Sequence, residues 1–142
     1  RCMMFKRILV AVDGSDHSWK AARLAGDFCR SMPADLWVIT VFDPIPGYIG
    51  QPYLDHAIAA RLEVTEELMK KALEEIGDIP GELNSETLEG PVAEAILRVI
   101  DARKIELVDM GTRGLGRLRG LVLGSQSQKV VQHATCPVLL VR

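Results

Sequence analysis

The chain has 142 residues, 48% hydrophobic and 25% charged, a composition typical of one soluble globular domain. Its formal net charge of −2 argues against a dedicated nucleic-acid-binding protein, because such proteins carry a strong basic excess. No apolar run approaches membrane-spanning length, and nothing at the start resembles a signal peptide. We therefore expect a single domain over residues 1–142, with neither a nucleic acid nor a membrane as partner.

The three cysteines indicate a reducing compartment. Cys2, Cys29 and Cys136 are odd in number and show no CxxC spacing. Free thiols are the expected state, so we expect a cytoplasmic protein.

Short apolar runs alternate with segments of helical periodicity along the chain. The runs predict strands at residues 8–12, 36–42, 82–88, 105–110 and 138–141. Helical spacing of apolar residues predicts helices at residues 19–32, 54–76, 92–100 and 130–134, with a proline-rich loop at 43–53. The run at 82–88 is the most polar and should lie at a sheet edge. This alternation predicts an α/β fold of the Rossmann-like type, a parallel sheet with helices on both faces.

Three glycines with a characteristic spacing follow the fourth predicted strand. Gly111, Gly114 and Gly124, with Ser125 next, give the spacing G-x2-G-x9-G-S. Glycine lets backbone N–H groups approach a ligand closely, and the following helix offers unpaired N–H groups and the positive end of its dipole. The loop is therefore predicted to bind an anion, most naturally a nucleotide. It is neither a Walker A loop nor a dinucleotide fingerprint, because the required lysine and third glycine are missing.

Two other predicted strand ends carry turn chemistry suited to the same crevice. Ligands of open parallel sheets bind beyond the carboxyl ends of the strands. Asp13-Gly14-Ser15 follows the first predicted strand, and Asp43-Pro44 follows the second. Asp13 could accept hydrogen bonds from a sugar hydroxyl or an exocyclic amine, and a helix N-cap or an Asx turn is an equally good interpretation.

These motifs together resemble the universal stress protein family, in its ATP-binding branch. The match covers nearly the whole chain and includes residues 8–15, 90–96 and, most closely, the end of the chain from 110–114 through 124–125 to 136–141. The resemblance implies an open five-stranded sheet in the order 3-2-1-4-5. It also implies a homodimer through the last strand (residues 137–142), and ATP, with Mg²⁺, as the cofactor.

The resemblance also implies roles for individual residues. Asp13 would lie against the adenosine, with Ala11 nearby, and the backbone of Val41 would contact the adenine edge. Gly111 would lie by the ribose, while Gly114, Gly124, Ser125 and Gln126 would hold the phosphates, helped by the Ser127 hydroxyl. The implied binding residues are Ala11, Asp13, Val41, Met110, Gly111, Gly114, Gly124, Ser125, Gln126 and Ser127.

Two residues depart from the family pattern. Gln126 stands where a small apolar residue is usual, although a backbone contact would survive that change. Asp109 stands in a strand position that is normally apolar, and a buried charge is costly without partners. Hydrogen bonds to hydroxyls or to a helix N-terminus are the favoured explanation. The alternatives are that Asp109 and Asp13 hold a divalent metal, or that the charge repels a triphosphate.

The leading functional prediction is an ATP-binding regulatory protein of the stress-response type, with an unidentified protein partner. No catalytic residues and no metal ligands are assigned, and the three histidines show no metal-binding spacing. Any ATP hydrolysis should be slow, because no base has a visible orienting partner. Arg113 and Arg117 could neutralise phosphates or simply be solvated. The alternatives are an ATPase or nucleotide-dependent transferase, or a dimeric scaffold that has lost nucleotide binding.

Overall fold

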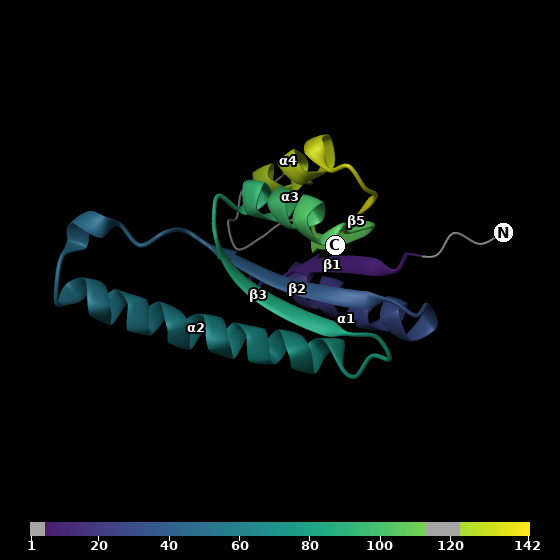
Figure 1. Cartoon of the computed structure of the whole chain (residues 1–142), viewed down its shortest axis with the longest axis horizontal. Coiled ribbons are helices and arrows are strands. Elements are labelled where there is room, and N and C mark those ends of the chain that lie inside the picture. Colours follow the sequence, from purple (N-terminus) through teal and green to yellow (C-terminus); the bar gives the residue numbers. More distant parts are fainter. Residues whose placement is uncertain (1–4, 113–122) are drawn as a thin grey trace.

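The computed structural model describes residues 5–112 and 123–142, which form a parallel sheet between two layers of helices (Figure 1). The strands are β1 (Arg7–Ala11), β2 (Asp35–Phe42), β3 (Leu83–Glu89), β4 (Leu107–Gly111) and β5 (Val138–Val141). The helices are α1 (Asp16–Ser31), the short η1 (Gly47–Ile49), α2 (Tyr53–Ile76), α3 (Val92–Arg103) and α4 (Ser125–His133). The sheet order β3-β2-β1-β4-β5 confirms the predicted α/β fold and strand order.

The predicted elements differ from the structure chiefly at their ends. Helix α4 begins at Ser125, a full turn before the apolar residues that predicted it. Its first turn is polar and faces a pocket, so it carries no apolar periodicity. The predicted loop at residues 43–53 contains η1, and α2 begins inside it at Tyr53.

Two apolar cores lie on the two faces of the sheet. Helices α1 and α2 cover one face, and Ala22, Ala25 and Ile76 pack there against Val10 and Val38. Helices α3 and α4 cover the other face, where a second cluster is built on residues such as Leu9, Ile96, Val108 and Val130. Side chains of a strand alternate between its faces, so each strand contributes to both cores.

Strand β4 places a carboxylate in the core under α1. Leu107 belongs to the core on the side of α1 and α2, whereas Val108 and Met110 belong to the opposite core. Asp109 therefore shares the face of Leu107. It pairs in register with Val10 and Leu139, which belong to or pack against the same core, and it is fully buried.

The two edges of the sheet have different chemistry. Strand β3 is one edge, as its polar sequence predicts, and its residues alternate between exposed and half-buried. Strand β5 is the other edge, and its four residues, Val-Leu-Leu-Val, are all half-buried. An apolar edge strand with one unpaired side is a ready site for pairing with another strand.

Helix α2 is the longest helix in the described ranges, at 24 residues, and runs along the sheet face with one end projecting beyond it (Figure 1). Its buried residues are Thr65, Ala72 and Ile76, all in its second half. Within residues 5–112 and 123–142, no helix combines the length and the apolar content that crossing a membrane requires.

Candidate functional site

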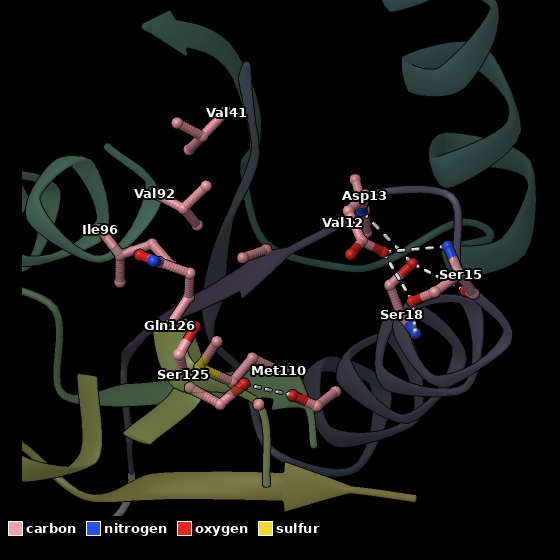
Figure 2. A pocket seen from close by; sticks show the side chains of 14 residues that line it. Val12, Asp13, Ser15, Ser18, Val41, Val92, Ile96, Met110, Ser125 and Gln126 are labelled. Carbon is pink, nitrogen blue, oxygen red and sulfur yellow. Dashed lines mark hydrogen bonds between the residues drawn. The ribbon is translucent and has the colours of Figure 1, made fainter. Parts of the chain in front are cut away.

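A pocket of about 280 Å³ lies at the carboxyl ends of β1, β2 and β4 (Figure 2). Its described lining residues are Ala11, Val12, Asp13, Ser15, Ser18, Val41, Val92, Ile96, Met110, Gly111, Gly124, Ser125, Gln126 and Ser127. Every predicted binding residue that the structure describes is in this set. Gly114 lies outside the described residues. The structure therefore brings the predicted residues to one place, at the switch point where ligands of open α/β sheets bind.

The end of β1 leaves the backbone of β2 open toward the pocket. Pairing of β1 with β2 ends with Ala11 opposite Ile39, and the Val12 N–H donates to the Ile39 carbonyl at 2.9 Å. Ile39 therefore directs its peptide groups toward β1, and Val41, two residues on, does the same. Because β1 has turned away, Val41 has no β1 residue opposite it. Its N–H and carbonyl therefore face the side that β1 has left, and the contact of this backbone with an adenine edge stays a prediction.

Asp13 is held by the first turn of α1. Its Oδ1 accepts hydrogen bonds from the Ser15 N–H at 2.9 Å and the Ser15 hydroxyl at 2.6 Å (Figure 2). This is an Asx turn, one of the two structural interpretations of Asp13. The N-cap of α1 is Ser15, whose Oγ accepts from the Ser18 N–H. Gly14 has a φ of +89°, which favours glycine at this turn. Asp13 thus has a structural role and also lines the pocket.

The first turns of α1, α3 and α4 converge on the pocket. Ser18 comes from α1, Val92 and Ile96 from α3, and Ser125 and Ser127 from α4. The first intrahelical bond of α4 runs from the Gln128 N–H to the Gly124 carbonyl. No hydrogen bond among the described residues therefore uses the N–H groups of residues 125–127. These free donors and the positive ends of the helix dipoles favour an anion.

Two serines of α4 have different environments. Ser125 is the first residue of the helix, and Gly124 is the N-cap. The Ser125 hydroxyl is exposed and so accessible to a ligand. The Ser127 hydroxyl is buried and donates to the Gly111 carbonyl at 3.0 Å, which ties α4 to the end of β4. A hydroxyl has one proton, so in this arrangement Ser127 positions the helix. Its contact with phosphate stays a prediction.

Gly111 is required where β4 meets α1. A Cβ atom at this position would lie 2.8 Å from the His17 Cβ and 3.2 Å from the Ser18 backbone nitrogen. Next to it, the Thr112 Oγ1 and the His17 Nδ1 are 2.9 Å apart. The glycine therefore lets the start of α1 pack directly against the end of β4, which closes one side of the pocket.

The sequence matches a known protein family over almost its whole length. Residues 4–142 match the family model described as the universal stress protein family. The chain belongs to the universal stress protein family. A universal stress protein of Thermus aquaticus is 47% identical over 139 residues, which cover 98% of this chain and all of that relative.

Solved structures of the family share this fold. The universal stress protein UspA of Lactobacillus plantarum has a TM-score of 0.83 at 24% identity, covering 99% of this chain and 100% of its own. A universal stress protein solved in complex with cAMP has a TM-score of 0.66 at 26% identity, covering 99% of this chain and 98% of its own. The five-stranded α/β architecture is therefore that of the family.

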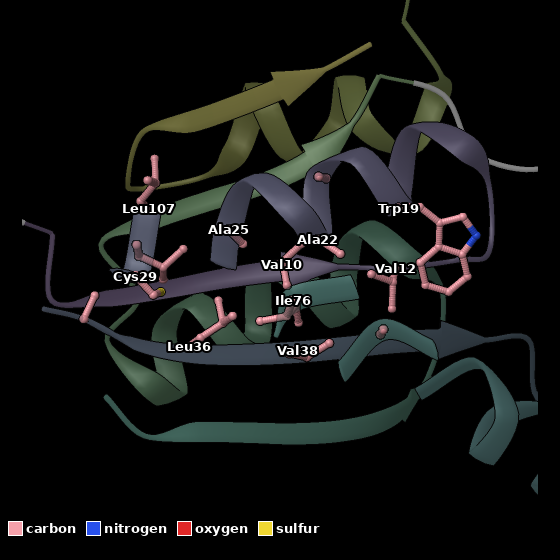
Figure 3. Close-up of a cluster of buried hydrophobic side chains, with 14 residues drawn as sticks. Val10, Val12, Trp19, Ala22, Ala25, Cys29, Leu36, Val38, Ile76 and Leu107 are labelled. Atoms are coloured by element: carbon pink, nitrogen blue, oxygen red, sulfur yellow. The ribbon is translucent and has the colours of Figure 1, made fainter. Parts of the chain in front are cut away.

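Asp109, the larger departure from the family pattern, is isolated within the core. It is fully buried, and neither carboxylate oxygen has a hydrogen-bond partner in the described part of the chain. The favoured explanation, hydrogen bonding to hydroxyls or a helix N-terminus, is therefore wrong. It shares a face of β4 with Leu107, which belongs to the apolar cluster drawn in Figure 3. Burial raises its pKa from 3.8 to about 8, so the group is mostly protonated at neutral pH.

The proposed metal pair of Asp109 and Asp13 is also not formed. Asp13 lines the pocket, whereas Asp109 is not among the described lining residues. Asp109 pairs with Val10, which lies inside β1, and Asp13 follows the end of that strand. Across residues 5–112 and 123–142, no three His, Cys, Asp or Glu side chains are grouped to hold a metal ion. Arg113 and Arg117, the candidate phosphate-neutralising arginines, lie outside the described residues.

Sequence reasoning missed the apolar wall of the pocket. Val92 and Ile96, both from α3, line the pocket and are absent from the predicted binding residues. The signal was present in Gly90-Pro91, which starts this helix beside the end of β2, where the Gly90 N–H donates to the Phe42 carbonyl. Ser18 was missed because a polar residue at helical spacing resembles an ordinary surface position.

Proposed function

We propose that this chain binds an adenine nucleotide, with ATP as the ligand, and regulates a partner through its occupied state. The observation that carries the proposal is the division of one pocket into three chemistries. One side is an apolar wall with the open backbone edge of Val41. Another carries the Asp13 carboxylate, which Ser15 holds in place, and the unused N–H groups at the start of α4 line a third part. A nucleotide offers a flat base, a ribose and phosphate in the same order.

The base fits the wall made by β1, β2, α3 and β4. Ala11, Val92, Ile96 and Met110 provide apolar contact for its faces. The N–H and carbonyl of Val41 form an acceptor-and-donor pair for its edge, because β1 has ended beside them. Adenine has a ring nitrogen next to an amino group, which matches one donor and one acceptor.

The ribose and phosphates fit the polar side. Asp13, anchored by Ser15 through Oδ1, would accept from a ribose hydroxyl. The free N–H groups at the start of α4, with the exposed Ser125 hydroxyl, would hold phosphate oxygens. Mg²⁺ would be carried in with the triphosphate, since the described residues provide no dedicated metal site.

Comparison with the family supports this ligand class. A structure that shares this fold at 26% identity was solved with cAMP. cAMP and ATP have an adenine, a ribose and phosphate in common, so the same three-part pocket serves both. ATP is proposed from the complete glycine spacing G-x2-G-x9-G-S.

The regulatory part of the proposal rests on the β5 edge. Its residues 138–141 are apolar and half-buried, so pairing with the same strand of a second copy would bury both. This strand pairs with β4, whose last residue, Gly111, lines the pocket. Occupancy of the pocket can therefore favour one dimer geometry. Hydrolysis is expected to be slow, because Asp13 is committed to holding the loop and the described lining contains no other ionisable side chain.

A calorimetric titration of nucleotide-free protein with ATP tests the binding. Asp13→Asn keeps an oxygen for the Ser15 N–H but removes the charge, so it should preserve the fold and weaken ATP binding at least tenfold. Asp16→Asn is the matched control, because Asp16 carries the same charge in the first turn of α1 and does not line the pocket. Saturable binding that is equally strong in all three proteins would contradict the proposed site.

A further inference from the structure

Gln126 joins two helices across the pocket. It is the second residue of α4, and its Oε1 accepts a hydrogen bond from the Ala93 N–H of α3 at 3.0 Å. Helix α3 has no capping side chain of its own, because its N-cap is Pro91. Gln126 therefore supplies the cap acceptor from another helix, at the second helical position where cap oxygens normally bond. A small apolar residue at this position could not do this.

This bond fixes which way the amide of Gln126 points. A backbone N–H can only donate, so the atom facing Ala93 must be the carbonyl oxygen. The amide nitrogen, Nε2, is then directed away from the α3 backbone. No hydrogen bond among the described residues uses Nε2. Gln126 thus keeps two N–H donors for another group.

The free donors lie beside the part of the pocket that suits a base. Figure 2 shows the Gln126 side chain next to Val92 and Ile96, opposite Asp13 and Ser15. Gln126 and Val92 also line an adjoining hollow of about 540 Å³, whose other described lining residues are Asp43, Pro44, Gly90 and Pro91. The Gln126 side chain therefore lies on the apolar side of the pocket, away from the Asp13 carboxylate that is proposed to bind the ribose. The ligand group within reach is the heterocyclic base.

We propose that the Gln126 amide nitrogen donates a hydrogen bond to a ring nitrogen of the bound purine, which makes Gln126 a specificity-determining residue. The inference rests on the proposed nucleotide function and adds a side-chain contact to the backbone contact of Val41. The base would then be held from two directions, by the peptide edge of β2 and by the amide of α4. Because the same amide caps α3, its position is set before the ligand arrives.

Adenosine and its deaza analogues test this contact without phosphate charge. Each analogue, 1-deaza-, 3-deaza- or 7-deazaadenosine, replaces one ring-nitrogen acceptor with carbon. Calorimetry with the native chain should show two analogues binding about fivefold more weakly than adenosine, the loss expected for one neutral hydrogen bond each. One lacks the nitrogen that faces the Val41 N–H, and the other lacks the nitrogen that faces Gln126. In Gln126→Met, adenosine should bind about fivefold more weakly, the first analogue should keep its penalty, and the second should suffer no further loss.

Gln126→Glu separates the ligand contact from the cap. A glutamate still offers an oxygen to the Ala93 N–H, so its melting temperature should match the native value, whereas Gln126→Met should melt a few degrees lower. Both variants should bind adenosine more weakly than the native chain, and Gln126→Glu at least as weakly as Gln126→Met, because a carboxylate has no proton to donate to a ring nitrogen. The inference is overturned if fewer than two analogues bind the native chain more weakly than adenosine, or if every penalty seen with the native chain persists in Gln126→Met. If adenosine and ATP both fail to bind the native chain, the proposed function itself fails.

Discussion

Two aspartates near the ends of neighbouring strands have opposite environments. Asp13, just after β1, is partly buried and accepts two hydrogen bonds from Ser15. Asp109, inside β4, is fully buried, and neither oxygen has a partner in the described residues. The first is held as an acceptor at the edge of a pocket, and the second is a neutral acid in an apolar layer. A position near the carboxyl edge of a sheet therefore does not by itself make a carboxylate part of the site.

The difference follows from strand alternation and from where the strands end. Asp13 lies beyond the last β1 pair, where the chain turns and solvent reaches the pocket. Asp109 still has a strand on each side, and its side chain lies on the face covered by α1. One carboxylate is thus available to a ligand, while the other affects only stability. The predictions below test this division.

The largest effect is expected in the pH dependence of stability. The Asp109 pKa is about 8 in the folded chain, against 3.8 ordinarily. Folding must then take up a proton between pH 4 and 8, so this group lowers the free energy of unfolding as pH rises, by roughly 4 kcal/mol between pH 5 and 8. Asp109→Asn cannot ionise and should lack this loss, as measured by urea unfolding at both pH values. Parallel pH profiles for the two proteins would refute the buried-acid assignment.

Asp109→Val should raise the free energy of unfolding at pH 7 by roughly 2–4 kcal/mol. The substitution removes the cost of keeping the acid neutral and adds apolar contact, less some strain from the larger side chain. Urea unfolding measures the change. Asp101→Asn, at an exposed position of α3, is the control and should leave stability within about 0.5 kcal/mol. A destabilised valine variant would mean that Asp109 has a partner that supports it.

Ser15→Ala should lower the free energy of unfolding by about 1 kcal/mol, because it removes the N-cap of α1. It also removes the hydroxyl that donates to Asp13, so ATP binding should weaken a few-fold. Thermal unfolding and calorimetry on the same preparation measure both. If stability falls and affinity does not, Asp13 has no part in the ligand contact.

The smallest effect is expected from Asp109→Val on nucleotide affinity. Asp109 is absent from the described pocket lining, and its uncharged form exerts no repulsion on a triphosphate. The dissociation constant for ATP at pH 7 should change less than twofold. A larger change would restore a functional role for this residue and would erase the contrast with Asp13.

The fold could be predicted almost completely from sequence. Short apolar runs and helical periodicity report burial directly, so the α/β alternation and the polar edge at β3 follow from single residues and their spacing. The start of α4 could not be found in this way, because Ser125 and Gln126 face a pocket and have no apolar signature. Strand order came from the family resemblance and is confirmed by the structure.

The site could be predicted only in part. Turns at strand ends require particular residue types, so Gly111 and Asp13 could be recognised from the sequence. The tertiary pairing of Gln126 with Ala93 leaves none, because it joins residues 33 positions apart on two helices. The sequence also could not show that Asp109 has no hydrogen-bond partner among the described residues, because such partners come from elements distant in the chain. Sequence therefore located the pocket, and side-chain geometry revised the expected roles of residues such as Asp109 and Ser127.

The most direct test of the central claim, that this pocket binds an adenine nucleotide, has two steps. Freshly purified protein is denatured and any released nucleotide is identified, and nucleotide-free protein is then titrated with ATP. Chromatography and mass spectrometry should find an adenine nucleotide, and the emptied native chain should bind ATP saturably, with Asp13→Asn weakened and Asp109→Val unchanged. Protein that releases no nucleotide and does not bind added ATP would contradict the account.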